Sequence, residues 1–244
     1  AESGVKHVTL ELGGKNAMVV FDDADLDAAA VGAVNGMNFT WSGQSCGSNS
    51  RVLIHRSIYD VMTEKISAIV KSRIIGDPLD DASQQGTMIN QSQFEKSMRY
   101  IDIAKQEGAR VVVGGGKPEG AKYDTGFFVE ATVLADVAPD STVGQEEIFG
   151  PVMSLIPFDT EADAIRIANG VEYGLTASVW TKDLGRAHRV AHDFEAGYVW
   201  INASSVHYPG TPYGGVKRSG VGGKEECLEE LLSYTEEKVV NVVY

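Results

Sequence analysis

The chain of 244 residues is long enough for one large α/β domain or two small ones. Hydrophobic residues make up 43% and charged residues 23%, which is ordinary for a folded protein and excludes intrinsic disorder as the main interpretation. Thirty-four acidic against 21 basic residues give a net charge of −13, so we expect no nucleic-acid partner. No apolar run approaches the roughly 20 residues of a membrane span, so we expect no membrane either.

Cysteine and histidine usage adds to these exclusions. Two cysteines, Cys46 and Cys227, are too few for a disulfide framework, and the first residues lack the apolar stretch of a signal peptide. We therefore expect reduced thiols and a cytoplasmic location. The five histidines share no metal-ligand spacing, so no metal site is expected.

Strand-like and helix-like segments alternate from the start of the chain. Alternation of apolar and polar residues indicates strands, and apolar residues three to four apart indicate helices. The first half is expected to contain a strand at 5–12, a strand at 17–21, a helix at 26–37 capped by Asp25, a strand at 51–55 and a helix at 57–74.

The second half continues the same alternation. It is expected to contain a helix at 92–108 ended by Gly108, a buried strand at 109–113, strands at 152–158, 176–181 and 198–201, and helices at 161–169 and 184–194. This order predicts an α/β fold: an open, mostly parallel, twisted sheet with helices on both faces. The last residues, 236–244, read as an apolar strand that either joins this sheet or crosses to another subunit.

Cys46 is the first candidate catalytic residue. It lies among small polar residues in the segment 41–51, whereas a cysteine kept for packing usually has apolar neighbours. Small neighbours leave room for a substrate, and their N–H groups are expected to lower the thiol pKa and to stabilise an oxyanion. The segment alone is equally typical of a nucleophile and of an inert thiol.

Glu11 is the second candidate. It lies between two leucines at a strand end, before Gly13 and Gly14, where partial burial would raise its pKa toward the range of a general base. By itself it is better explained as the polar residue of an alternating strand. The acidic turn 145–152 (QEEIFGPV) is likewise better explained, alone, by solvated charges.

In this order, the three segments resemble the aldehyde dehydrogenase superfamily. The segments 174–177 (GLTA), 198–202 (YVWIN), 212–220 (PYGGVKRSG) and 234–238 (YTEEK) agree with it as well. The resemblance runs from Val8 to Tyr244. It implies that the chain is the catalytic, C-terminal half of such an enzyme and that the N-terminal dinucleotide-binding domain is not part of it.

The resemblance implies oxidation of a small-molecule aldehyde to a carboxylic acid with NAD or NADP, through a thiohemiacetal and a thioester on the cysteine. Cys46 would be the nucleophile and Glu11 the general base for hydrolysis, which favours a non-acylating enzyme. The implied cofactor-binding residues are Leu12, Gln93, Lys96, Glu147 and Phe149. The implied substrate-binding residues are Ser45, Gly47, Asn202, Ser205, His207 and Tyr213.

The resemblance also implies a division of the chain. Residues 1–14 would end the cofactor-binding domain, 15–230 would form the catalytic domain, and 231–244 would be an oligomerisation strand of a homodimer or homotetramer. Two residues depart from the family pattern: Tyr213 stands where phenylalanine is usual, and Lys224 where arginine is commoner.

Two other functions fit the same residues. A reactive Cys46 beside Glu11 could hydrolyse activated esters without a cofactor, because acylation and deacylation need no hydride transfer. The chain could also serve only in assembly, and Cys46 would then react like an ordinary thiol. Cys227, among acidic residues, is expected to react more slowly than an activated Cys46.

Overall fold

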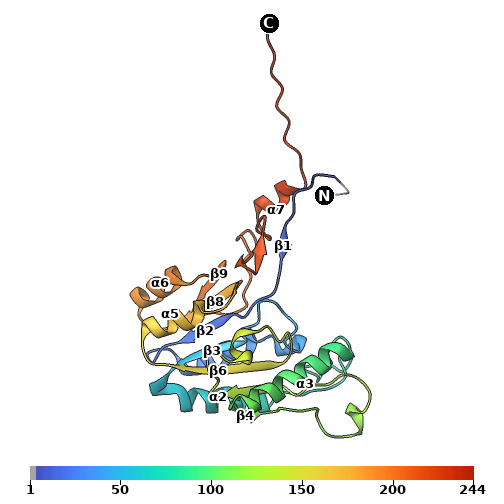
Figure 1. The fold of residues 1–244 in the computed structure, drawn as a ribbon, viewed down its shortest axis with the longest axis vertical. Coiled ribbons are helices and arrows are strands. Elements are labelled where there is room, and N and C mark those ends of the chain that lie inside the picture. Colours follow the sequence, from blue (N-terminus) through green and yellow to red (C-terminus); the bar gives the residue numbers. More distant parts are fainter. Residues whose placement is uncertain (1–3) are drawn as a thin grey trace.

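A computed structural model describes residues 4–244, and a seven-stranded sheet forms its centre (Figure 1). The strand order is β4-β5-β6-β3-β2-β8-β9, and every neighbouring pair is parallel except β4 with β5. The strands are β2 (Ala17–Val20), β3 (Arg51–His55), β4 (Arg110–Val113), β5 (Thr132–Ala135), β6 (Val152–Phe158), β8 (Thr176–Trp180) and β9 (Tyr198–Ile201).

Helices cover both faces of this sheet, as the sequence predicts. One hydrophobic core lies between the sheet and α3 (Gln91–Gln106), α5 (Glu161–Asn169) and α6 (Leu184–Asp193). The other core lies between the sheet and α1 (Leu26–Gly36) and α2 (Tyr59–Lys71). Successive side chains of β2 point to opposite faces of the sheet. Ala17 and Val19 therefore belong to the first core, and Met18 and Val20 to the second.

Most predicted elements have nearly the predicted bounds. Asp25 caps α1 by accepting a hydrogen bond from the Ala28 N–H at 3.1 Å, and Gly108 takes a φ of +92° just after α3. The expected helix at 57–74 is instead a short 3-10 turn, Arg56–Ile58, followed by α2, which ends at Lys71. The strand at 109–113 was expected to be buried, but β4 is an antiparallel edge strand and is only half-buried.

Two short ribbons lie outside the main sheet. β1 (Leu10–Glu11) pairs antiparallel with β11 (Gly220–Val221), and β7 (Tyr173–Gly174) pairs antiparallel with β10 (Val216–Lys217). The expected strand at 5–12 therefore shrinks to β1, which rises from the body of the molecule toward the C-terminal helix α7 (Leu228–Ser233) (Figure 1). The short helix α4 (Thr142–Gln145) completes the fold.

The C-terminal segment corrects one expectation. Residues 236–244 form no strand and project from the body as an exposed, extended chain, so the expectation that they join the domain's own sheet is wrong (Figure 1). Their crossing to another subunit remains a prediction. Within residues 4–244, no helix combines the length and the apolarity needed to cross a membrane.

Candidate active site

The candidate residues gather at the amino ends of neighbouring parallel strands. Cys46 lies on the loop before β3, Glu147 on the turn before β6, and Gly14 directly before β2. These strands are adjacent in the sheet order β6-β3-β2-β8, so the segments that precede them meet at one edge. Hydrogen bonds join them: the Gly14 N–H donates to Glu147 Oε1 at 2.8 Å, and Asn16 Nδ2 donates to the Cys46 carbonyl at 2.7 Å.

Asn16 fixes the cysteine loop. Its Nδ2 also donates to the Ser48 carbonyl at 2.9 Å, and its Oδ1 accepts from the Thr176 N–H at 3.0 Å. A single buried amide thus ties the loop to β2 and β8. The loop bends through Ser42 and Gly43, whose φ angles are +55° and +67°. A side chain on Gly43 would overlap the Gly150 carbonyl oxygen, so the close approach of the two loops requires glycine.

The electrostatics of Cys46 differ from the expectation. The backbone N–H groups of Cys46 and Gly47 do lower its pKa, as predicted. Burial of the thiol outweighs them, however, and the charges of Glu147 and Glu11 act in the same direction as burial. The net shift raises the thiol pKa, so the expectation of a lowered pKa is wrong.

Glu11, a residue of β1, lies against Gly214 and Gly215. Its two carboxylate oxygens are buried and make no hydrogen bond of standard geometry, although the Gly215 backbone lies close enough to lower its pKa. Burial raises the pKa, the Glu225 charge raises it further, and Lys224 opposes them. The expected rise in the Glu11 pKa is therefore confirmed. A Cβ on Gly214 would lie 2.5 Å from Glu11 Oε1, so glycine is needed beside the carboxylate.

The proposed cofactor residues converge on the turn before β6. Burial raises the pKa of Glu147, and the Gly14 N–H lowers it. Phe149 is 36% exposed with a φ of +58°, which presents its ring at the surface. Gln93 Nε2 donates to the carbonyls of Ile148 and Phe149 at 2.9 and 2.7 Å, so its amide holds this turn in place.

The other two predicted cofactor residues are Lys96 and Leu12. Lys96, one turn along α3 from Gln93, lies near enough to Glu147 for its charge to lower the pKa of the carboxyl group. Leu12 is 44% exposed, and its N–H donates to the Ser219 carbonyl at 3.0 Å. The Glu147 carboxylate itself lies beside Gly13 and Gly14, the two residues that follow Leu12.

The predicted substrate residues divide into two groups. Tyr213 is buried, and its hydroxyl oxygen lies 3.1 Å from the position that a Cβ on Gly47 would take. Ser45 Oγ accepts from the Gly47 N–H at 3.3 Å, and the His207 ring lies 4.8 Å from the Tyr213 ring. The structure thus brings Ser45, Gly47, His207 and Tyr213 to the cysteine loop.

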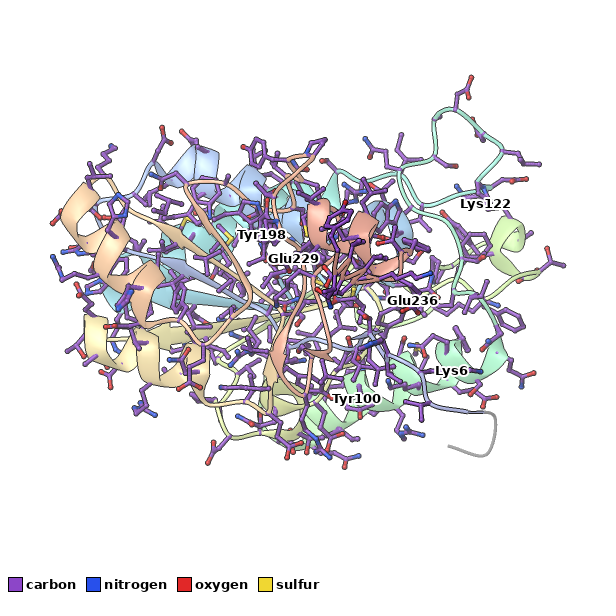
Figure 2. All side chains as sticks on the ribbon, turned by 90° about the horizontal axis from the view of Figure 1, so that it is seen from above. Lys6, Tyr100, Lys122, Tyr198, Glu229 and Glu236 are labelled. Atoms are coloured by element: carbon purple, nitrogen blue, oxygen red, sulfur yellow. The ribbon has the colours of Figure 1, made fainter. Side chains whose placement is uncertain are left out.

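The remaining two predicted substrate residues, Asn202 and Ser205, make hydrogen bonds within the fold. The Asn202 amide accepts from the Thr181 N–H and donates to the Thr181 carbonyl, both at 3.0 Å, which ties β9 to the end of β8. Ser205 Oγ donates to the Gly36 carbonyl at 3.5 Å. The loop that follows them is joined to the segment before α7, because His207 Nδ1 contacts Glu226 Oε1 at 2.9 Å. Figure 2 views this end and shows Tyr198 and Glu229 near the middle.

Sequence reasoning missed two buried cations beneath the site. Arg51, 1% exposed, donates to the carbonyls of Lys15, Ile167 and Ala168 at 2.8 Å each. Lys15 is also 1% exposed, and its Nζ makes no hydrogen bond with any described residue. Burial lowers the pKa of Lys15 to about 7. The sequence contains no signal that predicts the burial of Lys15 and Arg51, because it arises only when β2, β3 and α5 pack together.

The chain belongs to the aldehyde dehydrogenase family, whose family model matches residues 1–240. It is 45% identical over 246 residues to aldehyde dehydrogenase tropH of Talaromyces stipitatus, covering 99% of this chain and 48% of that protein. It is 46% identical over 242 residues to betaine aldehyde dehydrogenase of Rhizobium leguminosarum bv. trifolii, covering 99% of this chain and 49% of the relative.

Solved structures agree with the fold. Betaine aldehyde dehydrogenase of Staphylococcus aureus in complex with NAD+ superposes with a TM-score of 0.87 at 40% identity, covering 91% of this chain and 44% of that chain. PnpE of Pseudomonas sp. WBC-3 superposes with a TM-score of 0.90 at 40% identity, covering 93% and 46%. The chain thus spans about half the length of the relatives that it matches.

Proposed function

We propose that this chain is the catalytic half of an NAD- or NADP-dependent, non-acylating aldehyde dehydrogenase, which oxidises an aldehyde to a carboxylic acid. The observation that carries the proposal is the shared edge of the sheet. There the Cys46 loop, the half-buried Glu11 and the turn with Glu147 and Phe149 meet, in a chain of this family. The proposed domain division, with residues 1–14 ending the cofactor-binding domain, follows from the same membership.

The first chemical step belongs to Cys46. The thiol first releases its proton to solvent; the thiolate Sγ then attacks the aldehyde carbonyl, a carbon–sulfur bond forms, and the carbonyl oxygen becomes the oxyanion of a thiohemiacetal. The N–H groups of Cys46 and Gly47, which already lower the thiol pKa, lie where they can donate to developing negative charge. Small side chains at Ser45 and Gly47 leave room for the aldehyde.

The residues around Glu147 fit a nicotinamide cofactor in part. Leu12 and Phe149 expose apolar surface, and the Gly14 N–H orients the carboxylate of Glu147, which suits a flat ring attached to a ribose with two hydroxyls. Lys96 adds a positive charge near the same carboxylate. When bound, NAD or NADP would accept the hydride that leaves the thiohemiacetal carbon.

The last step belongs to Glu11. The carbon–sulfur bond is now that of a thioester, and a water molecule attacks its carbonyl carbon while Glu11 takes the proton. The carboxylic acid leaves and the proton returns to the cysteine sulfur. Burial without hydrogen-bond partners raises the Glu11 pKa, which makes its carboxylate a stronger base than a solvated one.

The aromatic residues beside the cysteine support an aldehyde with a flat or cationic group. The rings of Tyr198, Trp200, His207 and Tyr213 form a continuous cluster, with centroids 4.8 to 6.5 Å apart. Aromatic faces attract quaternary ammonium groups, and betaine aldehyde, the aldehyde in the names of several relatives, carries one. Betaine aldehyde therefore belongs in any substrate panel.

We also propose a cytoplasmic homo-oligomer, a dimer or tetramer. Val239, Val240, Val242 and Val243 are exposed on the projecting segment 236–244, and an apolar extended segment of this kind adds readily to the sheet edge of another copy. The assembly would cover these side chains. The strand at 236–244 would then form between subunits.

The test is Cys46-dependent formation of NADH or NADPH by the purified chain with a panel of aldehydes. Cys46→Ala is the blank, and circular dichroism shows that both proteins are folded. Cys46-dependent reduction supports the dehydrogenase. If no reduction occurs, Cys46-dependent hydrolysis of an activated ester by the same folded chain favours the second candidate, an esterase that needs only Cys46 and Glu11. Reduction that persists in Cys46→Ala would overturn the proposal.

A further inference from the structure

The side-chain amide of Asn16 is buried against the loop that carries the candidate nucleophile. Asn16 is 3% exposed, and its Nδ2 donates to the Cys46 carbonyl at 2.7 Å and to the Ser48 carbonyl at 2.9 Å. Its Oδ1 accepts from the Thr176 N–H at 3.0 Å. Carbonyl groups accept and backbone N–H groups donate, so these three partners allow the amide one orientation only.

The approach of the Cys46 carbonyl to this amide requires a glycine at position 14. A Cβ on Gly14 would lie 2.5 Å from the Cys46 carbonyl oxygen and 2.8 Å from Asn16 Oδ1, which is closer than a real Cβ comes. Any other residue would therefore push the carbonyl away from the amide. Gly14 and Asn16 together fix the position of this one carbonyl group.

The position of the carbonyl determines the direction of the next N–H group. The Cys46 carbonyl and the Gly47 N–H belong to one planar trans peptide group, in which they point in opposite directions. Because the carbonyl is directed at Asn16, the Gly47 N–H points away from Asn16, and it donates to Ser45 Oγ at 3.3 Å. The same N–H lowers the pKa of the Cys46 thiol, so it also lies near the sulfur.

The second carbonyl held by the amide extends the restraint to the far side of the cysteine. The Ser48 carbonyl and the Asn49 N–H form another peptide group, whose carbonyl accepts from Asn16 and whose N–H donates to the Gly36 carbonyl at 2.7 Å. The Ser48 N–H donates back to the Ser45 carbonyl at 3.2 Å, which closes a turn around the cysteine. The peptide group after the cysteine is thus held on both sides.

We propose that Asn16 is a positioning residue for Cys46, whose amide fixes the peptide group after the cysteine so that the Gly47 N–H is directed toward the sulfur. A hydrogen bond accepted by the carbonyl also polarises this peptide group and makes its N–H a stronger donor. A dipole that is already oriented stabilises developing negative charge without reorganisation. The inference rests on the proposed role of Cys46 as the nucleophile.

The test is the pH dependence of Cys46 alkylation by iodoacetamide, without aldehyde or NAD. Cys227→Ser provides a parent chain in which Cys46 is the remaining thiol. Asn16→Leu in this parent keeps the branched shape of the side chain and removes the amide without adding a charge. It is expected to raise the midpoint of the profile by roughly half a pH unit, so that alkylation below the midpoint slows about threefold. The rate at high pH, where the thiolate is fully formed, is expected to equal that of the parent.

The matched control is Asn169→Leu, which removes an amide that ties two other segments together. Asn169 Nδ2 donates to the Asp193 carbonyl at 2.8 Å, and its Oδ1 accepts from the Glu195 N–H at 2.9 Å. Neither partner belongs to the cysteine loop, so the profile is expected to match that of the parent. Asn16→Ala also deletes the amide and is expected to shift the midpoint in the same direction as Asn16→Leu. It keeps the test informative if Asn16→Leu fails to fold by circular dichroism.

An unchanged midpoint in the folded Asn16 variants overturns the inference, and so does an equal shift in Asn169→Leu. A lower midpoint with faster alkylation at high pH also overturns it, because the amide would then serve only to keep the sulfur buried. The outcome is independent of the proposed oxidation. A raised midpoint in a chain that forms no NADH supports the positioning role and leaves the dehydrogenase unsupported. NADH formation with an unshifted midpoint has the opposite meaning.

Discussion

Lys15 offers the sharpest test of the electrostatics beneath the site. Its amine is fully buried without a hydrogen-bond partner among the described residues, and burial lowers its pKa from 10.5 to about 7. The positive charges of Arg51 and Lys96 lower it as well, while the carboxylates of Glu147 and Glu146 raise it. The perturbation we consider is Lys15→Met, which keeps an unbranched apolar side chain, one heavy atom shorter, and removes the amine.

The sign follows from proton binding. Between pH 7 and 10.5 the unfolded chain keeps a proton on Lys15 that the folded chain has largely released, so the free energy of unfolding rises with pH in this window. A full difference of one bound proton changes the free energy of unfolding by ~1.4 kcal/mol for each pH unit within this window. Near the folded-state pKa the folded chain has released only part of the proton, so the free energy of unfolding rises less steeply there. Its total increase between pH 7 and pH 9 is therefore about 2 kcal/mol. The methionine variant lacks this contribution.

The assay is urea unfolding of the parent and Lys15→Met at pH 7 and pH 9, followed by circular dichroism. The difference in unfolding free energy, variant minus parent, is expected to fall by about 2 kcal/mol between the two conditions. The exposed Lys71→Met on α2 is the control, for which this difference should stay constant. A constant difference for Lys15→Met as well would refute the reasoning, because it would mean that the amine keeps its proton in the folded chain.

Three further predictions concern the site and the C-terminal segment. Glu11→Gln is expected to speed alkylation of Cys46 near neutral pH by roughly two- to threefold, because the carboxylate charge raises the thiol pKa, while it removes the ester hydrolysis proposed for this pair. Gly43→Ala is expected to lower the free energy of unfolding by roughly 2–4 kcal/mol, measured in urea, since its φ is +67° and a Cβ would strike Gly150. Deletion of 236–244 should change that free energy by less than about 0.5 kcal/mol, yet reduce self-association in sedimentation velocity.

The regular part of the fold could be predicted from local patterns. The bounds of α5, β6 and β9 match the expected ranges, because their apolar residues recur with the period of a helix or a buried strand. The ribbons could not be predicted in this way. β1 pairs with β11 across most of the chain, and a pair of two-residue strands has too few residues to show a period.

The residues of the candidate site were predicted from a resemblance, but the burial and the pKa shifts of those residues were predicted only in part. The expected rise in the Glu11 pKa held, but for another reason than its leucine neighbours: Leu10 and Leu12 are exposed, and the carboxylate lies against Gly214 and Gly215. The expectation for Cys46 failed because the effect of small neighbours was foreseen, while the burial of the sulfur and the approach of Glu147 depend on how separate strands assemble. Lys15 was missed for the same reason, since a lysine after two glycines reads as a surface residue until β2 is placed inside the sheet.

The charges around Cys46 suggest how its reactivity is controlled. Burial raises its pKa most and the charges of Glu147 and Glu11 raise it further, whereas the backbone N–H groups of Cys46 and Gly47 lower it. A thiol activated by a neighbouring cation would be ionised at rest and open to oxidation. A thiol stabilised by oriented dipoles, and opposed by carboxylates, stays mainly protonated at neutral pH. The Glu11 carboxylate is coupled to the thiol in this sense, because its charge makes Cys46 harder to ionise. Such coupling suits a sequence in which the sulfur is needed as a thiolate first and the carboxylate acts as a base later.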